Sequence, residues 1–244
     1  EATGMPVAST FAGKGVVPDG HDLALGATLR REEVAEYAAS RDLVLAVGTE
    51  LSPLDTGGAE LSGDLIHVDV DYANFGKNQS ADLGIVADAA EALSGIVRGV
   101  EERGVRYEGA REEVTGLKGE PLSDLAAAGD GRHRVLATLR SALDDDAVVV
   151  NDMTKLCYEA RAVFPVAEPD TFHFPRGYGT LGFSPPAAYG AAVGLPDRQV
   201  VALVGDGGFM FTVQELSTAV KYDLGVPVVV LSDDSYDVDR KSVV

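Results

Sequence analysis

Two aspartates follow two apolar runs near the end of the 244-residue chain, and together they could hold a metal ion. Asp206 follows the run 199–204 within Gly205-Asp206-Gly207-Gly208, and Asp233 follows the run 226–231. The residues between are predicted to be helical, which makes the stretch a βαβ unit. Both carboxylates then lie at the carboxyl edge of one parallel sheet, where such folds bind ligands. Spacing alone leaves another interpretation open, namely two turn residues in an Asp-rich protein.

The chemistry that this pair favours is a divalent cation holding a diphosphate. Mg²⁺ prefers oxygen ligands and keeps phosphate oxygens and water among them. Asp206, Asp233 and the carbonyl of Ser235 are the predicted metal ligands. Gly207 and Gly208 would let the backbone approach a phosphate, and the helix that follows would direct its N-terminal amides at the anion.

The elements that must position these residues form two α/β halves. The predicted domains are residues 1–99 and 132–244, joined by a linker over 100–131 that contains some local helix. Apolar runs predict buried strands, and apolar periods of about 3.6 residues predict helices. The expected strands are 42–49, 64–71, 83–87, 146–152, 200–204 and 226–231, and the expected helices are 31–40, 89–97, 133–143, 185–193 and 211–222. Alternating strands and helices predict two doubly wound, Rossmann-like domains with parallel sheets.

Composition is typical of a globular protein, except for its charge. Hydrophobic residues make up 45% and charged residues 24%, and no apolar run approaches the ~20 residues of a membrane helix. The N-terminus shows no signal peptide, and the single cysteine, Cys157, cannot form an internal disulfide. These features favour a protein of the reducing cytoplasm.

The charge balance is strongly acidic, with 39 Asp and Glu against 20 Lys and Arg and a formal net charge of −19. Such a surface repels nucleic acid and anionic membranes, so neither is expected as a partner. The acids are rich in Asp, and Arg outnumbers Lys. A solvated acidic surface is the simplest interpretation, and adaptation to a high-salt cytoplasm is a further hypothesis.

Several motifs together resemble the thiamine-diphosphate enzymes of the acetolactate synthase and 2-oxo-acid decarboxylase superfamily. The segment 205–216 through Asp233 is similar to the cofactor signature of that family, and 177–183 to its pyrimidine-side loop. The segment 186–191 is similar to its packing helix, while 13–15, 47–50 and 67–71 resemble its central domain. The resemblance covers nearly the whole chain.

The resemblance implies roles for particular residues. Asp206, Asp233 and Ser235 would hold Mg²⁺, the carbonyl of Gly179 would bind the aminopyrimidine, and Leu181 would support the bent cofactor. The full set expected to contact thiamine diphosphate is Thr154, Gly179, Thr180, Leu181, Asp206, Gly207, Gly208, Asp233, Ser235 and Tyr236. The segment from Asp152 to Lys155 would reach the diphosphate or form a plain loop.

The chain departs from the family pattern at several points. Ser232 and Asp237 stand where many relatives have Asn and Gly. Both ends look truncated, and the pyrimidine-binding domain, whose glutamate activates the cofactor, usually across a subunit interface, is not recognisable. We therefore expect no catalytic residue in this chain, and a homo-oligomer, dimer or tetramer, for the whole enzyme.

Other residues have competing interpretations. Asp69 and Asp71 end a predicted strand and serve either structure or ribose binding. Lys14, between two glycines, is either a turn residue or a phosphate contact, and Cys157 is expected to be buried packing.

The expected activity is decarboxylation of a 2-oxo acid, with or without carboligation to an acetolactate. Segments 48–51 and 152–154, with Tyr158, are similar to a decarboxylase branch that includes 5-guanidino-2-oxopentanoate decarboxylase. The alternative is a catalytically incomplete fragment that binds cofactor or serves in assembly.

Overall fold

A computed structural model describes residues 3–232 of the chain. They form two compact units, one of residues 3–13 and 21–118 and the other of residues 14–20 and 119–232. The strand pairs in the described residues are all parallel. The predicted α/β class with parallel sheets is therefore confirmed.

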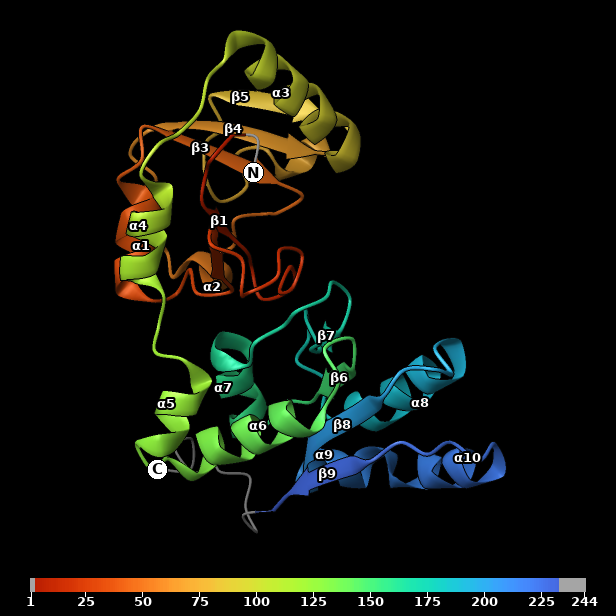
Figure 1. The fold of residues 1–244 in the computed structure, drawn as a ribbon. Helices are drawn as coiled ribbons and strands as arrows, with labels where there is room; N and C mark the ends of the chain where they lie inside the picture. The colour runs from red at the N-terminus through yellow and green to blue at the C-terminus, as the bar shows by residue number, and fades with distance from the viewer. Residues whose placement is uncertain (1–2, 233–244) are drawn as a thin grey trace, which may run out of the picture. The chain divides into compact units, whose positions relative to one another are not determined.

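The first unit is built on a three-stranded sheet of order β3-β4-β5 (Figure 1). Its strands are β3 (Leu43–Val47), β4 (Asp64–Asp69) and β5 (Leu83–Val86), with α2 (Pro53–Thr56) and η1 (Tyr72–Asn74) in the connections. Helix α3 (Ala89–Arg103) follows the last strand. The side chain of Asp88 caps it by accepting from the amides of Ala90 and Glu91, which are otherwise without partners in the helix.

A second, smaller layer completes this unit. Strands β1 (Val7–Ala8) and β2 (Ala24–Gly26) pair beside α1 (Glu32–Ala39) and α4 (Ala110–Leu117). A small core of Leu25, Val34 and Val114 joins one strand and both helices. Val34 lies in the segment 31–40, where apolar residues at helical spacing predicted a helix.

The second unit contains a four-stranded sheet of order β7-β6-β8-β9. Its strands are β6 (Val148–Asn151), β7 (Phe172–His173), β8 (Val200–Gly205) and β9 (Val228–Leu231). Its helices are α5 (Leu122–Ala127), α6 (Gly131–Ala142), α7 (Lys155–Val163), α8 (Ser184–Gly194), α9 (Asp206–Thr212), η2 (Val213–Glu215) and α10 (Leu216–Lys221).

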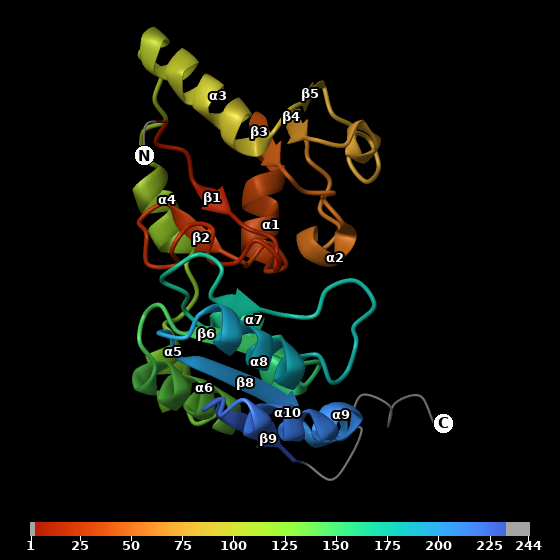
Figure 2. The ribbon, with the colours of Figure 1, turned by 90° about the vertical axis from the view of Figure 1, so that its right-hand side faces the viewer.

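Helices cover both faces of this sheet. Val201 and Leu203 of β8 pack with α5, α6 and α7, whereas Val200 and Ala202 pack against α8. Successive strand residues point to opposite faces, so burial on both sides requires the continuous apolar run seen in the sequence. Figure 2 shows the face that carries α8, α9 and α10. The two central strands, β6 and β8, thus bring their carboxyl ends together at one edge.

Some elements differ from the sequence expectations. The helix expected over 211–222 begins instead at Asp206 and passes through the 3-10 turn η2 before α10. The predicted linker 100–131 contains the end of α3, all of α4 and α5, and the start of α6. Helix α7 and the two-residue strand β7 were not anticipated.

Candidate functional site

The candidate site lies at the carboxyl edge of the second sheet, and Asp206 stands at its centre. β8 and β9 pair so that Gly205 lies opposite Leu231. This register puts Ser232 beside Asp206, and its hydroxyl donates a hydrogen bond to Asp206 Oδ2 over 2.9 Å. The other oxygen, Oδ1, accepts from the amide of Gly207 over 2.8 Å. The carboxylate is thereby oriented at the junction of the two strands.

Three of the predicted cofactor residues lie outside the described residues. They are Asp233, Ser235 and Tyr236, which come directly after Ser232 in the chain. In the described part of the chain, no group of three or more His, Cys, Asp or Glu side chains is arranged to hold a metal ion. Of the predicted metal ligands, the structure therefore places Asp206.

Thr154 lies just beyond the carboxyl end of β6, the strand next to β8. It precedes α7, and its Cβ and Oγ1 lie 3.4 Å from the point where a Cβ on Gly205 would stand. β6 and β8 are adjacent and parallel, with Asn151 opposite Leu203. Thr154 and the Gly205–Asp206 turn are therefore side by side at one edge.

The loop 177–183 contacts the same edge. The ideal Cβ position of Gly179 is 3.0 Å from Cε of Met153, and Gly179 has a φ of 63°, in the left-handed region. Thr212 of α9 donates a hydrogen bond from Oγ1 to the carbonyl of Gly182 over 3.1 Å. The loop therefore bridges the start of α7 and the end of α9. Within it, Leu181 is half-buried and Thr180 is exposed.

Gly208 is a glycine for a reason of packing. A Cβ at this position would lie 2.9 Å from Asp152 Oδ1 and 3.2 Å from Cγ2 of Val204. Real carbon atoms do not approach a carboxylate oxygen so closely, so a side chain does not fit. The first turn of α9 thus packs directly against the end of β6.

Asp152 is the residue whose role the sequence did not reveal. Its side chain is fully buried and accepts backbone hydrogen bonds from Met153, Gly182 and Ser184. This geometry directs the carboxylate into the fold, so it does not support a direct contact from Asp152 to a diphosphate. The two loop amides lie far from Asp152 in sequence, so no local pattern could have identified them.

Three other residues singled out from the sequence, Lys14, Asp69 and Asp71, have structural roles. Lys14 is buried and forms an ion pair of 2.8 Å with Asp19, whose Oδ2 also accepts from the amide of Val166. Asp69 accepts from the amide of Asp71, and Asp71 accepts from the amide of Ala73. These contacts favour the turn and strand-end interpretations.

Cys157 is buried on α7, as expected. Burial raises the pKa of the Cys157 thiol to about 12. Its Sγ faces the carbonyl of Leu203 at 3.7 Å. A thiol in this environment is packing and does not serve as a nucleophile at neutral pH.

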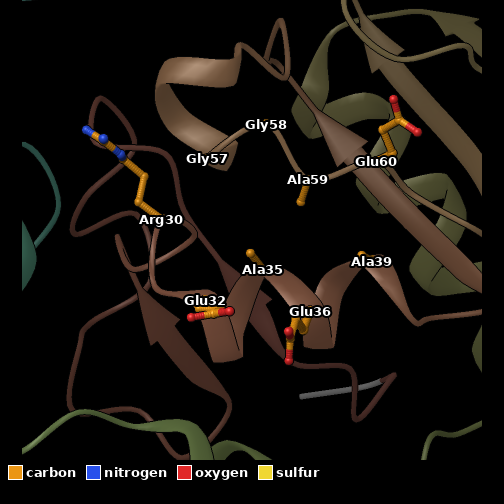
Figure 3. A pocket seen from close by; sticks show the side chains of 9 residues that line it. All are labelled: Arg30, Glu32, Ala35, Glu36, Ala39, Gly57, Gly58, Ala59 and Glu60. Carbon is orange, nitrogen blue, oxygen red and sulfur yellow. The ribbon is translucent and has the colours of Figure 1, made fainter.

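A separate pocket of about 360 Å³ lies in the first unit, between α1 and the turn at Gly57 and Gly58 (Figure 3). Its charged side chains are Glu32, Glu36 and Glu60 with Arg30. It has no part in the edge of the second sheet described above.

Comparisons with known proteins agree with this geometry. A family model described as the central domain of thiamine pyrophosphate enzymes matches residues 1–96. A second, described as the C-terminal TPP binding domain of the same enzymes, matches residues 152–242 and so includes the whole candidate edge. The chain belongs to the thiamine pyrophosphate enzyme family. The resemblance found in the sequence is confirmed, and with it thiamine diphosphate as the cofactor of the family.

Individual relatives of this thiamine pyrophosphate enzyme chain match it over nearly its full length. It is 36% identical over 233 residues to a probable 2-ketoarginine decarboxylase of Pseudomonas aeruginosa, covering 95% of this chain and 42% of that protein. It is 30% identical over 257 residues to a probable acetolactate synthase large subunit of Methanococcus aeolicus, covering 96% and 43%. An acetolactate synthase of tobacco chloroplasts is 32% identical over 244 residues, covering 96% and 37%. The chain thus spans less than half the length of these relatives.

Membrane insertion by a helix finds no support in residues 3–232, where none of the helices is both long and apolar enough to span a bilayer.

Proposed function

We propose that this chain is the cofactor-anchoring part of a thiamine-diphosphate- and Mg²⁺-dependent enzyme that acts on 2-oxo acids. The observation that carries the proposal is the convergence of Asp206, Thr154 and the loop 177–183 at one sheet edge. That edge lies within the segment that matches the TPP binding domain. The reaction is decarboxylation, with or without carboligation.

The residues of this edge fit the proposed cofactor in their chemistry. Asp206 offers a carboxylate, a hard oxygen donor that suits Mg²⁺. Ser232, which is hydrogen-bonded to Asp206, immediately precedes the proposed ligand Asp233 in the sequence. Gly207 adjoins the carboxylate through its amide. We assign Asp206, Asp233 and Ser235 to the metal and Gly207, Gly208, Thr154 and Tyr236 to the diphosphate side.

The loop 177–183 supplies the other side of the proposed site. Gly179 presents its backbone in a left-handed conformation beside Met153, which suits the role of its carbonyl as a pyrimidine acceptor. Thr180 and Leu181 follow at the turn and are assigned to the cofactor as well. When bound, thiamine diphosphate supplies an electron sink for the pair released as a 2-oxo acid loses CO₂.

In this proposal the residues of the chain hold and orient the cofactor, and none of them transfers a proton. The glutamate expected to activate the cofactor would come from another domain, across the interface of a homo-oligomer. An assembly of two or four subunits in the cytoplasm is part of the same proposal. The alternative function, a fragment that only binds cofactor or assembles, predicts binding without turnover.

Turnover tests this proposal directly. The chain should be assayed in an assembly that includes the domain proposed to supply the glutamate, with Mg²⁺ and thiamine diphosphate, and CO₂ release should be measured with pyruvate and with 2-ketoarginine. The second compound is favoured by the 36% identity to a probable 2-ketoarginine decarboxylase. Release of CO₂ from either substrate, lost on omission of cofactor, supports the enzyme. Cofactor binding with no turnover of either substrate supports the fragment.

A further inference from the structure

Asp152 is a fully buried carboxylate that directly follows β6, and its two oxygens accept hydrogen bonds from backbone amides. Oδ1 accepts from the amides of Met153 over 2.8 Å and Gly182 over 3.1 Å. Oδ2 accepts from the amide of Ser184 over 2.9 Å. A buried carboxylate is stable in a fold when such donors replace the water that it has lost.

These bonds join segments that are remote in the chain. Gly182 and Ser184 are 30 and 32 residues away from Asp152. Ser184 is tied down a second time, because its hydroxyl donates to the carbonyl of Val150 over 2.6 Å. The C-terminal end of the loop 177–183 is thus fixed to β6 through both the side chain and the backbone of that strand.

The same carboxylate also sets the position of α9. Gly208 lacks a side chain where Asp152 Oδ1 approaches, and Thr212 of the same helix bonds to the carbonyl of Gly182. Asp152, Gly182 and α9 therefore each contact the other two. A movement of Asp152 would displace both the loop and the helix that begins at Asp206.

We propose that Asp152 is a positioning residue that holds the Gly179–Leu181 loop and the Asp206 turn at a fixed separation, so that the two sides of the site meet one cofactor. The inference rests on the proposed function for its ligand, thiamine diphosphate. Its structural part, the control of the loop by the carboxylate, stands independently of the ligand.

Asp152→Asn is the discriminating variant because it keeps the size of the side chain. An amide has one acceptor oxygen, and its NH₂ group would face an N–H donor where the second carboxylate oxygen accepted one. At least one of the three backbone bonds is then lost. Asn151→Ala is the matched control, since it removes a part-buried hydrogen bond from the same strand, which Asn151 donates to the carbonyl of His173 in β7.

Two measurements on the full-length protein test the proposal. Hydrogen exchange by mass spectrometry should show that peptides spanning 177–184 exchange at least about tenfold faster in Asp152→Asn, with no such change in Asn151→Ala. Calorimetry with Mg²⁺ present should show thiamine diphosphate binding weakened about tenfold or more in Asp152→Asn and within about twofold of wild type in Asn151→Ala.

The outcomes separate the two claims. Unchanged exchange over 177–184 in Asp152→Asn would overturn the positioning role, as would equal weakening of binding by both variants. If the wild-type protein binds no thiamine diphosphate, the proposed function fails, while the exchange measurement still decides whether Asp152 holds the loop. If Asp152→Asn does not fold, Thr212→Val loosens the same loop through Gly182. Thr212→Val should speed hydrogen exchange over 177–184 and weaken the binding of thiamine diphosphate. If neither quantity changes, the proposal is overturned.

Discussion

The hydroxyl of Ser232 donates a 2.9 Å hydrogen bond to Asp206 Oδ2, which joins the ends of β8 and β9. The serine at this position provides a hydrogen-bond donor to the carboxylate. The bond holds Ser232, the last residue that the structure describes, beside Asp206. Asp206 and Ser232 thus follow the neighbouring strands β8 and β9, as a βαβ unit requires.

Gly208→Ala should destabilise the protein by about 1–3 kcal/mol, because the added methyl group would meet Asp152 Oδ1 and Val204. Gly190→Ala is the matched control, since Gly190 lies within α8 and a Cβ there meets nothing within 4 Å. The Gly190→Ala substitution should raise the free energy of unfolding by about 0.5–1 kcal/mol, because alanine has the higher helix propensity. Urea unfolding measures both, and equal effects would contradict the packing argument.

Glu113→Gln should lower stability in a manner that depends on pH. Tyr37 and Tyr107 donate hydroxyl hydrogen bonds to Glu113, and they hold the pKa of that carboxyl below its usual value of 4.5. A lowered pKa means that the stabilisation is present above the unfolded-state pKa and is lost as the pH falls through the folded-state pKa.

The expected cost at pH 7 is about 1 kcal/mol, a reduced value because the Glu113 side chain is 37% exposed. The difference from wild type should shrink as the pH falls below about 4.5. Urea titrations at pH 7, 5 and 3.5 measure it, with the exposed neighbour Glu112→Gln as control. A difference that stays constant over this range would show that the carboxylate charge is not responsible.

Cys157 should be inert in the folded protein. With burial raising the pKa of the thiol to about 12, its thiolate fraction at pH 8 is lower by about 10³-fold than that of a thiol at the ordinary value of 9.0. Reaction with a disulfide reagent such as Ellman's should therefore be slow in buffer and rapid in denaturing urea. Comparable rates in the two conditions would place Cys157 in an accessible environment.

Salt should stabilise the protein, given a net charge of −19. Screening of repulsion acts mainly up to a few hundred millimolar, where the Debye length falls to a few ångströms. Adaptation to a high-salt cytoplasm predicts that the melting temperature continues to rise in KCl between about 0.5 and 2 M. A melting temperature that is the same in low and molar salt would remove this hypothesis.

Much of the edge could be predicted because its signals are local. Apolar runs followed by polar residues predicted β6, β8 and β9 and put Thr154 at a neighbouring strand end, while its closeness to Gly205 is a finding of the structure. The start of α9 was misplaced because Gly207 and Gly208 have low helix propensity. Its contacts with Asp152 and Gly182 hold that turn in place, and tertiary contacts of this kind leave no local pattern.

Two further elements show the same limit. β7 contains two residues, too few for an alternating pattern. α7 does carry a signal, since Leu156, Cys157 and Ala160 are buried at helical spacing, and a closer count of that period would have predicted it. Asp152 accepts hydrogen bonds from amides about thirty residues away in the chain, and a contact at that separation can be identified when the fold is known.

Calorimetric titration of thiamine diphosphate into the protein, with Mg²⁺ or with a chelator, tests the central claim most directly. Asp206→Asn is the test variant, and Asp197→Asn, an exposed change before the start of β8, is the control. We predict saturable binding that needs Mg²⁺, weakened about fiftyfold or more by Asp206→Asn and unaltered by Asp197→Asn. No binding at millimolar cofactor, or equal affinity in Asp206→Asn and wild type, would contradict the assignment of this sheet edge to the cofactor.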